Sequence, residues 1–164
     1  MALYDADGAP TGAVAPRRLV YRDGLWHAAT GVLLRSSDRQ RLYLHRRTDT
    51  KLVHPGAFDC WAGGVVDPGE TPDAAAAREL AEELGVRGAP LTPLGRYVYD
   101  DGRLRYHIFA YEAFWDGPVT WQPEEVAWGA WITVAELRAL LSDPARPFAP
   151  DGRLGADRWL ARQQ

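Results

Sequence analysis

Three glutamates with helical spacing are the residues of this sequence best suited to chemistry. Glu79, Glu82 and Glu83 lie in the segment 64–86, whose sequence is GVVDPGETPDAAAARELAEELGV. Because a helix turns by about 100° per residue, Glu82 and Glu83 project about 60° and about 40° to either side of Glu79. Like charges this close destabilise a helix by roughly 0.3 kcal/mol per pair unless a cation binds. The spacing therefore predicts a divalent metal site, and carboxylate oxygens favour Mg²⁺, with Mn²⁺ as the alternative.

Local signals predict the helix that positions these glutamates. Thr71 is a suitable N-cap, and Pro72 suits the first helical position. Strong helix formers fill 74–84, and Gly85 is the stop expected after a helix C-terminus. We therefore expect a helix that begins at Pro72 and ends before Gly85.

The segment 64–86 resembles the Nudix box, the motif of a family of diphosphate hydrolases. Gly64 is followed after five residues by Glu70 and after seven more by Arg78-Glu79-Leu80-Ala81-Glu82-Glu83-Leu84-Gly85-Val86, so every specified position matches. A helix with merely solvated glutamates would leave the glycines and Arg78 unexplained. The resemblance is specific over the 23 residues of the box.

The resemblance implies roles for individual residues. Glu70 and Arg78 correspond to the pair that orients the site, and Arg78 is counted among the catalytic residues. The metal-binding and catalytic positions of the family fall on Glu79, Glu82, Glu83 and, through its backbone carbonyl, Gly63. Glu82 is the expected proton acceptor within the box, while Glu124 and Glu125, in a later loop, are candidates outside it or ordinary solvated charges.

The implied reaction is attack of water at phosphorus, assisted by metal. The expected activity is Mg²⁺-dependent hydrolysis of the phosphoanhydride linkage in a nucleoside diphosphate or a related small molecule. Two alternatives stay open: an isopentenyl-diphosphate isomerase-like enzyme, and a non-catalytic nucleotide-binding sensor that keeps the fold.

Residues ahead of the box resemble the isopentenyl-diphosphate isomerase branch of the family. The similarity lies in DADGAPTG at 5–12, LWHAATG at 25–31 and RRTDTKLVHPGAFD at 46–59. It implies that Arg47 and Lys51 contact the substrate diphosphate, a role that suits both charges.

The isomerase chemistry itself is predicted to be absent. The catalytic cysteine of that branch falls at Gly63, and Cys60 is three residues early. His27 matches one isomerase metal ligand, but its expected partner near Val20 or Tyr21 is missing, and a structural role for His27 is the alternative.

Patterning along the chain, together with the resemblance, predicts an α/β/α sandwich with a mixed central β-sheet. Thr133 and Glu136 form a capping box ahead of a helix over 134–141, expected on the face opposite the box helix. A short terminal helix is expected near 156–162. Strand signals predict extended segments at 25–34, 41–46, 58–66, 94–99, 104–115 and 126–132.

Composition limits the class of protein. The 164 residues suit one domain, expected to comprise an arm at 1–24, a core at about 25–142, and a loop with a short helix at 143–164. The formal charge of −3 argues against nucleic acid as the main partner. The single cysteine excludes an internal disulfide, and the short apolar runs exclude a membrane helix, so a cytoplasmic protein is expected. A homodimer is the default expectation for its assembly.

Overall fold

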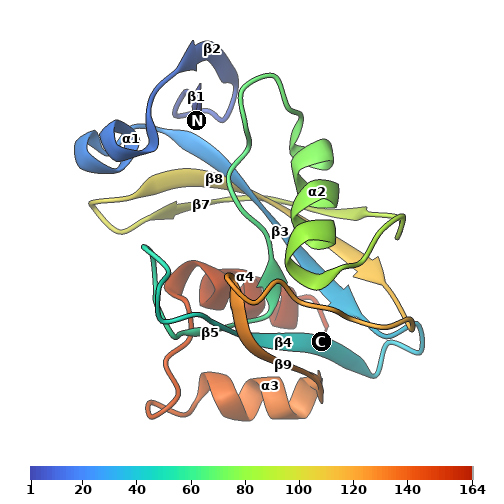
Figure 1. Cartoon of the computed structure of the whole chain (residues 1–164). Coiled ribbons are helices and arrows are strands. Elements are labelled where there is room, and N and C mark those ends of the chain that lie inside the picture. Colours follow the sequence, from blue (N-terminus) through green and yellow to red (C-terminus); the bar gives the residue numbers. More distant parts are fainter. Residues whose placement is uncertain (164) are drawn as a thin grey trace.

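A mixed β-sheet lies between helix α2 on one face and helices α3 and α4 on the other (Figure 1). The computed structural model describes residues 1–163. The helices are α1 (Arg17–Asp23), α2 (Pro72–Leu84), α3 (Val134–Leu141) and α4 (Pro150–Ala161). The strands are β1 (Ala2–Tyr4), β2 (Pro10–Val14), β3 (His27–Arg35), β4 (Arg41–Arg47), β5 (Phe58–Asp59), β6 (Trp61–Ala62), β7 (Thr92–Asp100), β8 (Arg105–Phe114) and β9 (Val126–Thr133). The predicted sandwich with a mixed sheet is confirmed.

Strands β3 and β4 diverge directly after the hairpin that joins them. They pair at Arg35 and Leu42; beyond that point β3 pairs with β6 on this side, and β4 pairs with β9 along its length. On its other side β3 lies parallel to β8, from His27 beside Tyr106 to Arg35 beside Phe114. The sheet therefore opens between β3 and β4.

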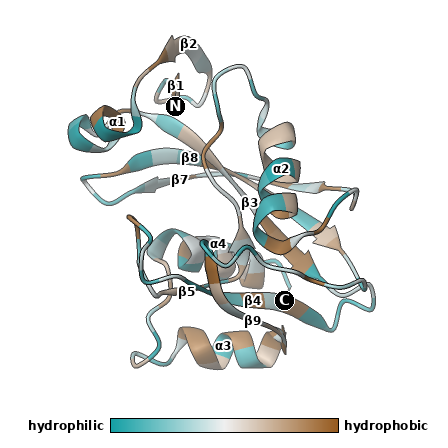
Figure 2. Cartoon of the chain, in the orientation of Figure 1, coloured by the Kyte–Doolittle hydropathy of each residue, from teal (hydrophilic) through white to brown (hydrophobic). Residues whose placement is uncertain are grey.

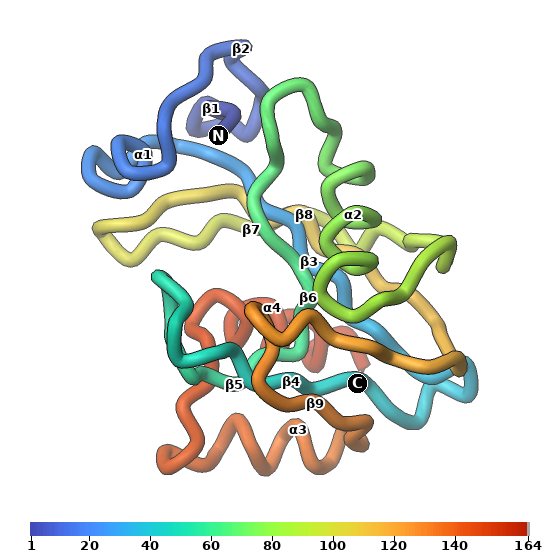
Figure 3. Tube along the Cα trace, viewed as in Figure 1, coloured from blue at the N-terminus to red at the C-terminus, as the bar shows by residue number. Residues whose placement is uncertain are grey.

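The segment that contains β5 and β6 crosses this opening. Asp59 pairs with His45 of β4, whereas Trp61 pairs with Leu33 of β3. Figure 3 follows the chain from β5 through β6 to the loop ahead of α2. The expected continuous strand over 58–66 is therefore wrong in its continuity, because the segment changes partners at Cys60. It is irregular at Gly63 and Gly64, after which a bridge between Val65 and Ala29 continues the pairing with β3.

Alternating side chains of β3 form the two halves of the core. Val32 and Leu34 pack with Leu80 and Leu84 of α2. Leu33 faces the opposite way, in a cluster with residues of α3 and α4 that includes Trp159. This period of two is the pattern of a strand buried on both faces. Hydrophobic and hydrophilic stretches alternate along α3 in Figure 2, as expected for a helix with one buried face.

Helix α2 begins and ends as its sequence predicts. The Thr71 hydroxyl accepts a hydrogen bond from the Ala74 amide at 3.2 Å, and Gly85 adopts a left-handed conformation with φ of 68°. Thr133 and Glu136 likewise form the predicted capping box of α3.

Two helices differ from expectation. Helix α1, within the N-terminal arm, was not predicted, because its seven residues give too short a pattern. Helix α4 begins at Pro150 rather than near 156. Proline favours the first position of a helix, but Gly152 and Gly155 have low helix propensity, so the sequence pattern did not indicate a helix this early. The arm otherwise forms a hairpin, β1 with β2.

Within residues 1–163, no helix is long and apolar enough to cross a membrane. The predicted division into arm, core and C-terminal segment stays a prediction, and its last residue, Gln164, lies outside the described residues.

Replacing Leu80 by Ala should lower the free energy of unfolding by about 2–5 kcal/mol, because Leu80 is 1% exposed and the truncation leaves a cavity between α2 and β3. Urea denaturation followed by circular dichroism measures the change. The matched control is Leu52→Ala, since Leu52 is 84% exposed. Equal stability of the two variants would contradict the packing of α2 described above.

Candidate metal and diphosphate site

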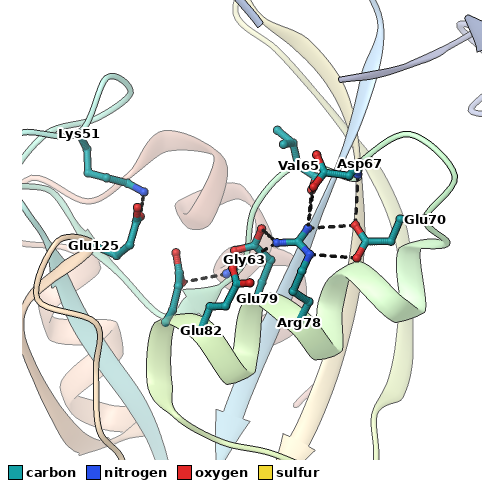
Figure 4. Close-up of polar contacts among 10 residues, drawn as sticks. Lys51, Gly63, Val65, Asp67, Glu70, Arg78, Glu79, Glu82 and Glu125 are labelled. Atoms are coloured by element: carbon teal, nitrogen blue, oxygen red, sulfur yellow. Dashed lines mark hydrogen bonds and ion pairs between the residues drawn. The ribbon is translucent and has the colours of Figure 1, made fainter. Parts of the chain in front are cut away.

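Arg78 is the centre of the polar network around α2 (Figure 4). Its Nε and Nη2 atoms donate to the two carboxylate oxygens of Glu70 at 2.9 and 3.0 Å. Nη2 also donates to the Val65 carbonyl at 3.2 Å, while Nη1 donates to Glu79 at 2.7 Å and to Glu82 at 3.3 Å. One guanidinium group thereby joins the loop ahead of α2 to two of the three glutamates.

Two glycines let the loop approach the helix and the sheet. A Cβ atom on Gly64 would lie 2.4 Å from Oε1 of Glu79, and one on Gly63 would lie 1.9 Å from the Thr30 carbonyl oxygen. Any side chain at either position would therefore displace its neighbours. The Gly63 amide donates to Oε2 of Glu83 at 3.0 Å, so this glycine also orients a glutamate.

The three glutamates have different environments. Glu83 is 4% exposed, and burial raises its pKa to about 7, with a further contribution from the charge of Glu79. Burial also raises the pKa of Glu79, against the opposing effect of Arg78. The side chain of Glu82 is 51% exposed. Hydrogen bonds from Arg78 lower the pKa of Glu70, which fixes Glu70 as the charged partner of the guanidinium.

The donor set fits a hard divalent cation, although its side chains are not assembled around one. Burial and the charge of Glu79 raise the pKa of Glu83, and a bound cation would stabilise the charged form of such a carboxylate. Among residues 1–163, however, no three acidic, histidine or cysteine side chains are grouped closely enough to hold a metal ion. In the same part of the chain, no backbone amide donates to the Gly63 carbonyl, which leaves that oxygen free for a ligand.

Basic side chains lie across a cavity from the glutamates. The cavity has a volume of about 530 Å³, and both Arg47 and Lys51 line it together with Glu79, Glu82 and Glu83. Lys51 forms an ion pair with Glu125, and burial lowers the pKa of Lys51. Arg47 donates to the Val53 carbonyl at 3.0 Å, while its Nε atom is buried without a partner in the described part of the chain. The structure thus brings the expected phosphate ligands and the expected metal ligands to one cavity.

The N-terminal arm contributes residues that the sequence did not single out. Arg17 and Tyr21 of α1 line the same cavity. No local motif marks them, because the arm meets the core through tertiary contacts such as the pairing of β1 with β3. Glu124 and Glu125, from the loop ahead of β9, also line the cavity.

A second cavity of about 130 Å³ shares several lining residues with the first, among them Tyr21, Arg47 and Gly63. Its lining includes Asp59, at the end of β5, and Asp151, in the first turn of α4. Asp59 is 5% exposed, and one of its oxygens accepts a hydrogen bond from the Trp61 amide at 3.0 Å. Tyr106 donates its hydroxyl to Asp151 at 2.8 Å. Sequence reasoning missed both carboxyl groups, because they come from segments far apart in the chain.

The structure also places His27 and Cys60, the two residues that the sequence analysis compared with the isomerase branch. His27 is 3% exposed, lies against the rings of Tyr21 and Tyr106, and contacts the Leu25 carbonyl through Nδ1 at 3.1 Å. Cys60 is 1% exposed within the cluster beneath α3 and α4, and burial raises the pKa of its thiol well above the usual range. Cys60 therefore lies in the core rather than in either cavity.

Comparisons with known proteins agree with the box. A family model for the NUDIX domain matches residues 25–152. The Nudix hydrolase orf19 of Rhodococcus erythropolis is 52% identical over 162 residues, which cover 93% of this chain and 87% of the relative. The Nudix hydrolase SCO1686 of Streptomyces coelicolor is 43% identical over 140 residues, which cover 84% of this chain and 76% of the relative.

Solved structures share the fold. The crystal structure of DR0079 from Deinococcus radiodurans matches with a TM-score of 0.81 and 25% identity, over 96% of this chain and 97% of that one. The NUDIX domain of NrtR from Shewanella oneidensis, solved with ADP ribose, matches with a TM-score of 0.67 and 19% identity, over 85% of this chain and 89% of that one. The second match, at this identity, shows the fold alone. The expected likeness to the isomerase branch is not borne out, since these relatives carry the name Nudix hydrolase.

Asp59→Asn should reduce the pH dependence of stability between about pH 4 and about pH 8. Burial and the nearby Asp151 raise the pKa of Asp59 from 3.8 to about 8 in the folded protein. The folded state thus keeps a proton that the unfolded state releases above about pH 4, so the free energy of unfolding falls as pH rises through this interval. In the variant this fall should be smaller, as measured by urea denaturation at several pH values. The exposed Asp157→Asn is the control, and an unchanged profile in Asp59→Asn would refute the assignment.

Proposed function

The chain belongs to the Nudix hydrolase family, and from this premise we propose that it uses Mg²⁺ to hydrolyse the phosphoanhydride linkage of a nucleoside diphosphate or a related small diphosphate. The observation that carries the proposal is the cavity of about 530 Å³, which Glu79, Glu82 and Glu83 line together with Arg17, Arg47 and Lys51. Opposite charges around one cavity suit a ligand that contains both metal and phosphate.

Each wall has a distinct task in this proposal. Glu79, Glu82, Glu83 and the Gly63 carbonyl would hold the metal. Bound metal would lower the pKa of the attacking water and neutralise charge on the leaving phosphate. Arg78 contacts one oxygen of Glu79 and one of Glu82, which leaves the second oxygen of each for the metal, while the two bonds to Glu70 keep the guanidinium in place.

The basic wall would bind the diphosphate. The Nε atom of Arg47 is buried without a partner among residues 1–163, and Arg17 of α1 also lines the cavity. Lys51 is paired with Glu125, so substrate phosphate would compete with Glu125 for the ammonium group.

Glu82 is the proposed proton acceptor. Its exposed carboxylate is accessible to water, and its contact with Arg78 at 3.3 Å is the longest of the bonds that join Arg78 to glutamate. Glu125 is the candidate proton acceptor outside the box. If substrate phosphate paired with the Lys51 ammonium group, the Glu125 carboxylate would be free to accept a proton. Glu124, exposed on the same loop, is the weaker alternative.

Hydrolysis is favoured over isomerisation by the position of Cys60. The thiol is buried in the core on the side of α3 and α4, and Gly63 offers no side chain in its place. A non-catalytic sensor would bind diphosphates without turning them over, and the following experiment separates it from an enzyme.

We expect the protein to cleave at least one diphosphate when Mg²⁺ is present, and none after EDTA has removed the metal. The products can be followed by ³¹P NMR on a panel of nucleoside diphosphates, nucleotide sugars and isopentenyl diphosphate. Glu83→Gln should lower kcat by roughly a hundredfold or more, because a neutral amide weakens the metal site. Asp157→Asn, exposed on α4, should match the unmodified protein. Unchanged turnover in Glu83→Gln would remove Glu83 from the metal site, and binding without cleavage across the panel would favour a sensor.

Arg47→Ala, Lys51→Ala and Arg17→Ala should each raise KM by about tenfold for every diphosphate substrate alike, because each removes a charged phosphate contact. Steady-state kinetics on two substrates with different head groups measures this. The control is Arg138→Ala, an exposed position on α3. An increase confined to one head group would instead place the residue in substrate selection.

A further inference from the structure

The loop 48–57, which joins β4 to β5, is fixed by hydrogen bonds at its two ends. The Thr48 amide donates to the Glu125 carbonyl at 3.1 Å, which ties the start of the loop to the segment ahead of β9. The Gly56 amide donates to the Thr48 carbonyl at 3.1 Å, and the Gly56 carbonyl accepts from Nε of Arg46 at 3.1 Å. Both ends of the loop are therefore held against their neighbours.

The tip of this loop, residues 51–54, takes its position mainly from charged side chains. In the described part of the chain, no backbone carbonyl accepts a hydrogen bond from the amides of its last three residues. Instead, Lys51 forms an ion pair with Glu125 (Figure 4). Arg47 donates to the Val53 carbonyl at 3.0 Å. The side chains that hold the tip are thus the same two that are expected to bind phosphate.

His54 provides a third contact of the tip, and this contact is incomplete. Its Nε2 atom lies 3.9 Å from Oδ1 of Asp151, in the first turn of α4, which is too far for a hydrogen bond. Both atoms are buried, and neither has a hydrogen-bond partner in the part of the chain that the structure describes. A closer approach by about 1 Å would join them in one hydrogen bond and satisfy both atoms.

Both partners of this contact are prepared for such a bond. Tyr106 donates its hydroxyl to the other oxygen of Asp151 at 2.8 Å and so fixes the direction of the carboxyl group. His54 has a φ of 50°, a left-handed conformation that residues other than glycine adopt only where their surroundings require it. Burial lowers the pKa of His54, against the opposing effect of Asp151. The imidazole is therefore neutral at neutral pH, and it can donate through Nε2 to the carboxylate.

We propose that His54 is a positioning residue for diphosphate binding: its Nε2–H group donates to Oδ1 of Asp151 when a diphosphate binds and the tip of the loop moves by about 1 Å. Phosphate takes the Lys51 ammonium group from Glu125, which removes one anchor of the tip. The bond from His54 to Asp151 replaces that anchor and keeps Lys51 and Arg47 at the phosphate. His54 itself contacts neither substrate nor metal. The proposal rests on the diphosphate hydrolase function.

Binding of imidodiphosphate, a diphosphate analogue that resists hydrolysis, tests the proposal without turnover. Isothermal titration calorimetry with Mg²⁺ present should give a Kd about tenfold higher for His54→Asn, because one hydrogen bond to a charged group is lost. His54→Gln should bind within about twofold of the unmodified protein. Asparagine tolerates the left-handed backbone but is too short to reach Asp151, whereas the glutamine amide takes the place of Nε2. Equal losses in the two variants would overturn the proposal.

A double-mutant cycle connects His54 to Asp151. Asp151→Ala should raise the Kd for imidodiphosphate by the same factor as His54→Asn, and the double variant should bind no more weakly than either single variant. Asp157→Asn, at an exposed position of the same helix, is the matched control. Losses that multiply in the double variant would show that the two residues do not act through one bond, and the proposal would fail.

The bond itself can be followed by ¹⁵N NMR on histidine-labelled protein, with the His54 signals assigned by means of His54→Gln. His54 should be protonated at Nε2, and this nitrogen should shift when imidodiphosphate and Mg²⁺ are added, but not in Asp151→Ala. An unchanged signal while calorimetry records binding would contradict the proposal. If imidodiphosphate does not bind at all, the diphosphate function fails. The free protein then still decides the pair, because protonation of His54 at Nδ1 would overturn it and an Nε2 proton that is lost in Asp151→Ala would support it.

Steady-state kinetics separate positioning from a general loss of folding. On two substrates with different head groups, His54→Asn should raise KM about tenfold for both, with kcat within about twofold. A merely structural role would lower the melting temperature and the active fraction, and with them the apparent kcat, without this change in KM. A loss of kcat at unchanged KM, or an effect on one head group alone, would remove His54 from the positioning of phosphate ligands.

Discussion

The site depends on a single guanidinium group that must satisfy carboxylates on two segments at once. Arg78 binds both oxygens of Glu70 and the Val65 carbonyl, which holds the glycine-containing loop against α2. The same group contacts Glu79 and Glu82 and offsets part of their mutual repulsion. Bidentate pairing fixes direction as well as distance, so this loop is held to the helix more firmly than a lysine could hold it. The Gly63 carbonyl and the Glu83 carboxylate take their relative positions from that constraint.

The divergence of β3 and β4 provides the space that this network borders. Hydrogen bonding from β3 to β6 and from β4 to β9 separates the two strands beyond their hairpin, and the crossing segment from Asp59 to Trp61 forms the bottom of the opening. Helices α1 and α4 then close it from opposite ends of the chain, the first with Arg17 and Tyr21, the second with Asp151. The position of α4 depends on Gly152, since a larger residue would collide with Asp59.

Charge is divided unevenly within this space. Glutamates and cations both line the larger cavity, where metal and phosphate would neutralise them. The smaller cavity contains carboxyl groups, hydroxyl groups and aromatic rings, and burial holds the pKa of Asp59 well above its usual range.

The sequence by itself determined what depends on local order. The box, the limits of α2 and the capping of α3 follow from residues within a few positions of one another, and Thr71, Gly85 and Thr133 do what their types predict. Family, fold and hydrolase class follow from the same motif. Only the tertiary structure brought Arg17, Asp59 and Asp151 to the site, and it divided the expected strand over 58–66 into two strands with different partners. These features depend on pairing between segments as far apart as β5 and α4, and no short-range pattern in one sequence specifies which distant segments will meet.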